Sequence, residues 1–365
     1  MSSLSPLTMD ENLLLMIPGP TFLHPRVLRA MSKPLMPHRE QWFSDLFIEQ
    51  AERMKKVYQT ENDLIIFSGS GTSSMDAAVS NVMRPGDKVL CIVSGKFSER
   101  FVEIVEAHGG IPVVLEFEWG SPINPEKVKE KLTPDMKAVT MVHNESSTGV
   151  RNDVKPIADI VKDTDALLIV DCISSMGGDD IRVDEWGIDL CVAGSQKCLA
   201  VPPGLSFLSI SQKAWDVIDK RPGYCYYLNV KKYNDDEKKA PYTQSITLTY
   251  ALKEALDIIF EEGLQNRMER HNHLAEITRS GIKNLGLEIF PKSEDICSRT
   301  VTAFNAPEQK SEKDIRNTLK NRYNIVIAGG QAHLKGKIMR IGHMGNCQEK
   351  DIITTLACLE KALNM

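Results

Sequence analysis

The chain has 365 residues, of which 42% are apolar and 25% charged, as in ordinary soluble globular proteins. Its mass of 40.8 kDa favours two domains, or one large α/β domain with an appendage. The net charge of −5 lacks the basic excess of nucleic-acid-binding proteins. No apolar run reaches the roughly 18 residues of a membrane-spanning helix, and the first residues lack the basic region of a signal peptide. The sequence thus predicts a protein that binds neither nucleic acid nor membranes.

The cysteines are scattered along the chain. Their eight positions include no C-x-x-C pair and no histidine at a metal-ligand spacing. Several lie in apolar runs, as Cys191 does, where a free thiol packs as a small hydrophobic group. The sequence therefore predicts no metal site and a reduced, cytoplasmic protein.

Short apolar runs alternate with amphipathic stretches through the first two thirds of the chain. The predicted strands are Asp63–Phe67, Lys88–Val93, Ile111–Glu116, Ala138–His143, Ala166–Val170, Leu190–Ala193 and Ser206–Ile210. The predicted helices between them are Ser73–Met83, Phe97–His108, Pro125–Lys131 and Val154–Asp163. Strands separated by helices indicate crossover connections and a mostly parallel sheet covered on both faces.

The pattern changes near Tyr250. One long helical pattern runs from Leu248 to Leu285, and a polar, exposed loop is expected before it at Lys231–Lys239. The predicted elements that follow are strands Leu287–Ile289 and Val301–Phe304, helix Glu312–Tyr323, strands Ile325–Ala328 and Ile338–Ile341, and helix Glu349–Leu363. We predict a large α/β domain over residues 1–262 and a smaller α+β domain over residues 263–365.

The segment Ser68-Gly69-Ser70-Gly71-Thr72 follows the first predicted strand and opens a helix. Glycines permit a tight turn, and the N–H groups at a helix N-terminus favour an anion such as phosphate. The segment matches neither the P-loop nor the dinucleotide-binding pattern, so a nicotinamide-dependent dehydrogenase is not indicated. Taken alone, an ordinary helix cap explains it equally well.

Two ionisable residues end buried strands. Asp171 closes the run Leu167–Val170, and Lys197 follows Val192-Ala193-Gly194-Ser195-Gln196. Each has an ordinary explanation, a structural ion pair for the acid and a surface position for the lysine. Together with a phosphate-binding turn, however, they are what pyridoxal phosphate (PLP) requires. The lysine supplies the amine that reacts with the cofactor aldehyde, and the acid keeps the pyridine nitrogen protonated.

Residues 170–211, VDCISSMGGDDIRVDEWGIDLCVAGSQKCLAVPPGLSFLSIS, resemble the lysine region of class V aminotransferases of fold type I. The resemblance is strongest to the alanine–glyoxylate and serine–pyruvate or serine–glyoxylate branch. It extends to IPGPTFLHPRVL (17–28), SGSGTSSMDAAVSNVMRPGDKVL (68–90), HNESSTGV (143–150), TLTYALKEAL (247–256) and KGKIMRIGHMG (335–345). These motifs span nearly the whole chain.

The resemblance implies a fold type I PLP-transferase with a seven-stranded, mostly parallel sheet. It implies transamination between alanine or serine and glyoxylate or pyruvate, in a ping-pong reaction through pyridoxamine phosphate. The implied catalytic residues are Lys197, which forms the Schiff base, and Asp171. The implied cofactor-binding residues are Ser70, Gly71, Thr72, Phe97, Ser146, Asp171, Gln196, Lys197 and, from the other subunit of a homodimer, Thr243. The implied substrate-binding residues are Arg340, Gly19 and Ser146.

Two positions depart from the family pattern. Ala240 stands where the family often has a phosphate-binding tyrosine, for which Tyr242 is a candidate substitute, and Asn144 replaces the glycine of a His-Gly-Glu motif. A cysteine desulfurase of the same fold is the nearest alternative, but Gln196 precedes the lysine where that class usually has histidine. A non-catalytic α/β binding protein is the third possibility, and it would be colourless.

Overall fold

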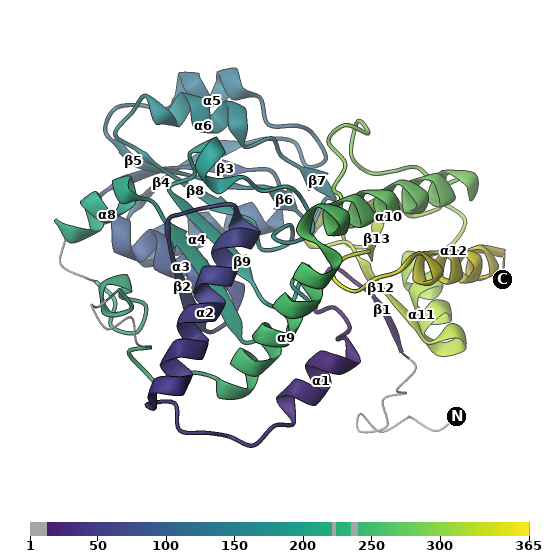
Figure 1. Ribbon diagram of the computed structural model, residues 1–365. Helices are drawn as coiled ribbons and strands as arrows, with labels where there is room; N and C mark the ends of the chain where they lie inside the picture. Colours follow the sequence, from purple (N-terminus) through teal and green to yellow (C-terminus); the bar gives the residue numbers. More distant parts are fainter. Residues whose placement is uncertain (1–12, 221–223, 235–239, 365) are drawn as a thin grey trace.

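The computed structural model describes residues 13–220, 224–234 and 240–364. Its larger sheet has seven strands in the order β2-β10-β9-β8-β5-β3-β4, which confirms the predicted sheet. The strands are β2 Asp63–Ser68, β3 Lys88–Val93, β4 Ile111–Glu116, β5 Met136–Val142, β8 Leu167–Asp171, β9 Leu190–Gly194 and β10 Leu205–Ile210. Because only β10 is antiparallel to its neighbours, the other six strands end at the same edge of the sheet (Figure 1).

Both faces of this sheet are buried. Along β3, Leu90 and Ile92 pack into one hydrophobic core, whereas Val89 and Cys91 pack into another on the opposite face. This alternation follows from the two-residue period of a strand. The first core receives side chains of α2 Gln41–Tyr58, α6 Lys155–Lys162 and α9 Ile246–Glu262; the second receives those of α3 Gly71–Val82, α4 Lys96–Ala107 and α8 Gln212–Asp219.

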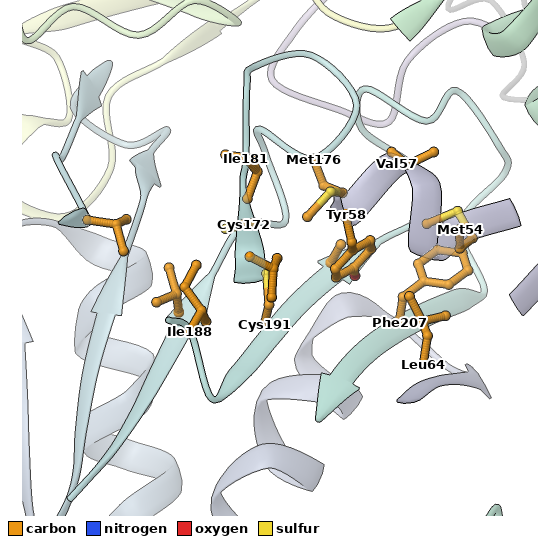
Figure 2. Close-up of a cluster of buried hydrophobic side chains, with 14 of the residues drawn as sticks. Met54, Val57, Tyr58, Leu64, Cys172, Met176, Ile181, Ile188, Cys191 and Phe207 are labelled. Atoms are coloured by element: carbon orange, nitrogen blue, oxygen red, sulfur yellow. The ribbon is translucent and has the colours of Figure 1, made fainter. Parts of the chain in front are cut away.

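Helix α2, which the sequence pattern did not predict, supports the side of the sheet formed by β2, β10 and β9. Figure 2 shows its side chains Met54 and Tyr58 directed at residues of β9 and β10, among them Cys191 and Phe207. All of these side chains are almost completely buried. This packing holds β9 and β10 in place, and polar residues of the candidate site lie at the ends of such strands.

A second, four-stranded sheet has the order β1-β12-β13-β11. Its strands are β1 Leu14–Met16, β11 Val301–Asn305, β12 Ile325–Gly329 and β13 Ile338–Gly342, and its core is shared with helices α10 Leu264–Asn284, α11 Glu312–Tyr323 and α12 Glu349–Asn364. Strand β1 pairs in parallel with β12, although more than 300 residues separate them in sequence. The N-terminal segment therefore contributes to the second sheet, and the division at residues 262 and 263 stays a prediction.

Three features differ from the sequence prediction. The long helix expected over Leu248–Leu285 is two helices, α9 and α10, because Gly263 between them has φ +84° and leaves the helical conformation. The strand expected at Leu287–Ile289 is reduced to a single bridge between Ile289 and Phe304. Much of the loop expected at Lys231–Lys239 lies outside the described residues.

The remaining elements are short. They are α1 Pro25–Met31, α5 Pro125–Lys131, the hairpin β6 Asn144–Glu145 with β7 Val150–Arg151, α7 Val183–Trp186, and the 3-10 turns Val230–Lys232 and Ala332–Leu334. Among the described residues, no helix is both long enough and apolar enough to cross a membrane.

Candidate active site

A cavity opens at the edge where the parallel strands end, as expected for ligand sites in such sheets. It brings together most of the predicted cofactor-binding residues with four others. Its lining is Ser70, Gly71, Thr72, Phe97, Arg100, Asn144, Ser146, Asp171, Ile173, Ser174, Gln196 and Lys197. Gly19, Thr243 and Arg340 are not part of this lining.

Lys197 lies three residues beyond β9 with its side chain partly buried. Burial lowers the pKa of its amine to about 8, and the nearby charge of Arg340 acts in the same direction. The Nζ atom donates a hydrogen bond to the carbonyl oxygen of Pro18. Gly19 packs directly on the lysine, since a Cβ added there would lie 2.5 Å from Lys197 Cδ. The predicted Gly19 position is thus beside the lysine, from the N-terminal segment.

Asp171 is the last residue of β8. Its Oδ1 accepts a hydrogen bond of 2.7 Å from the backbone N–H of Ile173. Burial raises the pKa of Asp171 to about 7 and the charge of Glu145 raises it further, whereas Arg100 and Lys197 oppose the rise. A cationic ligand group would restore the charged form of this carboxyl.

The glycine-rich turn forms another part of the cavity wall. Helix α3 begins at Gly71, where a Cβ would lie 2.6 Å from Ile173 Cδ1, so a larger residue would not fit. The amide oxygen of Gln196 is buried without a hydrogen-bond partner among the described residues. A buried polar atom without a partner is costly, which suits a side chain that binds a ligand. The free N-terminal N–H groups of α3 favour an anion here.

Phe97 is positioned by a buried carboxylate. Glu145 in β6 accepts hydrogen bonds from the backbone N–H groups of Phe97 (3.1 Å) and Ser98 (3.0 Å) at the start of α4. It also accepts a bond of 2.6 Å from the Ser147 hydroxyl. Burial raises the pKa of Glu145, and these hydrogen bonds oppose that effect. The carboxylate thereby anchors the first turn of α4 at the cavity wall.

Asn144, the departure from the family motif, joins three segments. Its Nδ2 donates to Ser174 Oγ at 2.8 Å, in the loop after β8, and to Thr300 Oγ1 at 3.0 Å, next to the second sheet. The asparagine thus links the cavity wall to the second sheet.

Arg340 lies in β13 of the second sheet, almost fully buried. Its Nη1 donates to the backbone oxygen of Ser146 at 2.8 Å, and Nε and Nη2 donate to that of Gly329 at 3.0 and 2.8 Å. Burial lowers the pKa of Arg340 to about 10. Because Ser146 lines the cavity, the guanidinium stands directly behind its wall.

Thr243 lies away from the cavity of its own chain. It is exposed, and its hydroxyl is 3.4 Å from Nε2 of His38. Tyr242 is also engaged elsewhere, since its hydroxyl donates to the Tyr226 carbonyl at 2.9 Å and its ring stacks on Tyr227. Within this chain Tyr242 does not line the cavity, and its substitution for the tyrosine missing at Ala240 stays a prediction.

Arg100 is the charged residue of the cavity that the sequence pattern did not single out. It follows Phe97 by three residues on α4 and so lies on the same helix face. That spacing was the only sequence feature that could have indicated it. Among the described residues, no cluster of histidine, cysteine and acidic side chains could hold a metal ion.

Comparison with known proteins identifies the family. The model of the family described as Aminotransferase class-V matches residues 15–352. The chain belongs to the class V aminotransferases.

The relatives of this aminotransferase match it along almost its whole length. An uncharacterized aminotransferase of Methanocaldococcus jannaschii is 53% identical, over 96% of this chain and 92% of that protein. A serine–glyoxylate aminotransferase of Methylorubrum extorquens is 38% identical, over 96% and 90%. The crystal structure of an alanine–glyoxylate aminotransferase from Nostoc sp. superposes with a TM-score of 0.94 at 33% identity, covering 99% of this chain and 98% of that one.

The cavity of this aminotransferase fits PLP, the cofactor of the family. It offers a buried amine, a carboxyl at a neighbouring strand end, an aromatic ring, a helix N-terminus and an amide oxygen without a partner. These groups correspond to the aldehyde, ring nitrogen, ring face and phosphate of the cofactor.

Proposed function

We propose that this aminotransferase moves amino groups between a small amino acid, alanine or serine, and a 2-oxo acid, glyoxylate or pyruvate. The names of the Methylorubrum and Nostoc enzymes support this substrate class. The observation that carries the proposal is that one cavity is lined by a buried amine and a buried carboxyl, with an arginine fork behind its wall.

When bound, PLP supplies an electron sink next to the α-carbon of the amino acid. Lys197 attaches the cofactor through its Nζ and, once released, moves the α-proton as general base and acid. Its pKa near 8 suits proton transfer close to neutral pH. Asp171 holds the proton on the pyridine nitrogen through its negative charge. The two half-reactions then follow ping-pong kinetics.

The remaining predicted residues divide between cofactor and substrate. Ser70, Gly71, Thr72 and Gln196 bind the phosphate, Phe97 stacks on the ring and Ser146 bonds near the phenolic oxygen. Arg340 binds the substrate carboxylate through its planar guanidinium. In the structure, neutral carbonyl oxygens accept the hydrogen bonds that the carboxylate would accept. Gly19 leaves room for the Lys197 side chain and lies in the segment that borders the substrate.

We further propose a homodimer in which Thr243 completes the phosphate site of the partner subunit. The exposed surface near it is apolar: Met36 is 48% exposed, Tyr226 75% and Leu35 70%. Large apolar side chains gathered on a surface favour association. Thr243 lies beside His38 in this region, which supports a contribution to a neighbouring site. Sedimentation of a fully active monomer near 41 kDa would exclude the dimer.

A desulfurase would need a thiolate that can reach the substrate. Cys347 is buried, and burial raises its pKa to about 12. Cys297 is also buried with a raised pKa. Neither thiol therefore provides the accessible nucleophile of that reaction. All eight cysteines are free, which supports the proposed cytoplasmic location.

The test is a half-reaction screen. The holoenzyme is mixed with a single amino acid and no acceptor, and the 2-oxo acid released in one turnover is quantified. We expect alanine or serine to release about one equivalent per site and bulky amino acids little. Cysteine that releases sulfide in preference to either would contradict the proposal. Steady-state rates with glyoxylate and pyruvate then identify the acceptor.

A further inference from the structure

The charges in the cavity are unequally distributed. Its lining contains three ionisable side chains, those of Arg100, Asp171 and Lys197. Lys197 reacts with the cofactor aldehyde, and Asp171 is an acid. Arg100 is therefore the one permanent cation among the described lining residues. A phosphate group that enters this cavity brings nearly two negative charges, which the dipole of α3 balances only in part.

Arg100 is held at the glycine-rich end of the cavity. Its Nη1 donates to Thr72 Oγ1 at 3.2 Å, in the first turn of α3. Its guanidinium carbon lies 5.0 Å from the centre of the Phe97 ring, within the range of a cation–π contact. Two neighbours on separate helices thus fix its orientation.

The guanidinium keeps most of its hydrogen-bonding capacity. Lys96, on the same helix, pairs with Glu99 at 2.8 Å and with Glu103 at 3.6 Å. Arg100, in contrast, has no carboxylate within 4 Å among the described residues. A guanidinium has five N–H donors, and that of Arg100 uses only one of them in a hydrogen bond to a side chain. Its charge also acts inside the cavity, since it lowers the pKa of both Asp171 and Lys197.

We propose that Arg100 binds the phosphate of PLP directly, as the cationic partner of the site formed by Ser70, Gly71, Thr72 and Gln196. The planar fork can bond two phosphate oxygens while its face stays on Phe97. Arg100 thus couples the phosphate contact to the ring that covers the cofactor.

The test compares PLP with pyridoxal, which has the same ring and aldehyde but no phosphate. Both are titrated into apoenzyme and followed by the change in protein fluorescence. For Arg100→Gln we expect the dissociation constant of PLP to rise at least about tenfold, as the loss of a charge-assisted bond predicts, and that of pyridoxal to change less than about twofold. Arg84→Gln is the matched control and should change neither, since the exposed Arg84 guanidinium bonds only the Lys220 carbonyl within the described part of the chain.

Equal losses for PLP and pyridoxal would overturn the proposal, because Arg100 would then act only by supporting Phe97. Unchanged PLP binding would overturn it as well. If Arg100→Gln does not fold, Arg100→Lys is tested instead, by the same comparison of the dissociation constants of PLP and pyridoxal. Phosphorus NMR of the wild-type holoenzyme adds an independent reading: we expect a phosphate that stays dianionic well below the ordinary second pKa of about 6. A resonance that titrates near 6 would contradict the direct contact.

Discussion

The charged groups that the two sheets place near the active site differ in their pKa shifts and in their hydrogen bonds. At the edge of the seven-stranded sheet, Asp171 and Lys197 are buried with few partners, and burial moves both pKa values toward neutrality. In the four-stranded sheet, Arg340 is also buried but makes three hydrogen bonds to carbonyl oxygens. The first pair can exchange protons near pH 7, whereas the arginine stays charged and oriented. In the proposed function, one sheet provides reactivity and the other provides recognition.

The difference follows from where the residues lie in their strands. Asp171 and Lys197 stand at or beyond the ends of β8 and β9, where side chains can reach a ligand. Arg340 lies in the middle of β13, opposite Ala303 of β11 and Ala328 of β12. Small neighbours leave room for its long side chain, and backbone oxygens replace the water lost on burial. Its hydrogen-bond partners are neutral carbonyls, so a substrate carboxylate would be a stronger partner.

The largest effect is expected for the amine at the reactive edge. Lys197→Ala removes both the cofactor attachment and the proton carrier, so we expect transamination to fall by at least about 10²–10⁴-fold. Borohydride reduction of the wild-type holoenzyme, followed by peptide mapping, should find the pyridoxyl group on Lys197. A label on Lys96 or Lys213 would reject the assignment. Lys88→Ala, at an exposed lysine paired with Asp135, serves as control.

The carboxyl should have the next largest effect. Asp171→Asn keeps the shape and the bond from Ile173 but loses the negative charge. We expect retained cofactor and a loss of about 10²–10³-fold in turnover, typical of a positioned electrostatic group. Cofactor content is measured by absorbance after alkaline release. Near-normal turnover in a folded, loaded variant would refute the role of Asp171.

These reactive groups were also the most predictable part of the molecule. Apolar runs that end in Asp171 or precede Lys197 are local patterns, and parallel strands bring their ends together without further information. The alternation of strands and helices likewise predicted the seven-stranded sheet.

What the sequence left open depends on contacts between distant segments. No local sequence pattern predicts the pairing of β1 with β12, because β1 has only three residues and so short an apolar run is not distinctive. Gly263 interrupts a helical pattern whose amphipathic period continues on both sides, so the break at φ +84° was missed. Arg100 belongs to an ordinary charged helix face until α3 and Phe97 are brought next to it.

The recognition side is tested by Arg340→Ala. Loss of a charge-assisted contact in a cleft costs about 2–5 kcal/mol, so amino-acid binding should weaken by about 30-fold or more. A simple amine without a carboxylate should be affected far less. Arg340→Lys should remain poor, because an ammonium cannot reproduce the fork. Unchanged binding of alanine and serine would make Arg340 structural.

The smallest expected effect is on the pKa of Lys197, which depends on charged groups of both sheets. This pKa is lowered to about 8, mainly by burial; the charge of Arg340 contributes to the lowering and that of Asp171 opposes it. Only the neutral amine attacks the cofactor aldehyde, so the rate of attachment to apoenzyme should rise with pH and level off above about pH 8. Arg340→Ala removes a lowering charge, so the pKa rises and the profile moves to higher pH.

Asp171→Asn removes a raising charge, so in that variant the pKa falls and the profile moves to lower pH. At pH 7 each shift should change the rate only severalfold, about twofold to fivefold, because shifts below one pKa unit change the neutral fraction by less than tenfold. Stopped-flow absorbance at saturating PLP measures both profiles. Opposite shifts would show that each sheet acts on the same amine. Shifts in the same direction would contradict the opposite charge effects, and the absence of any shift would mean that Lys197 responds to burial alone.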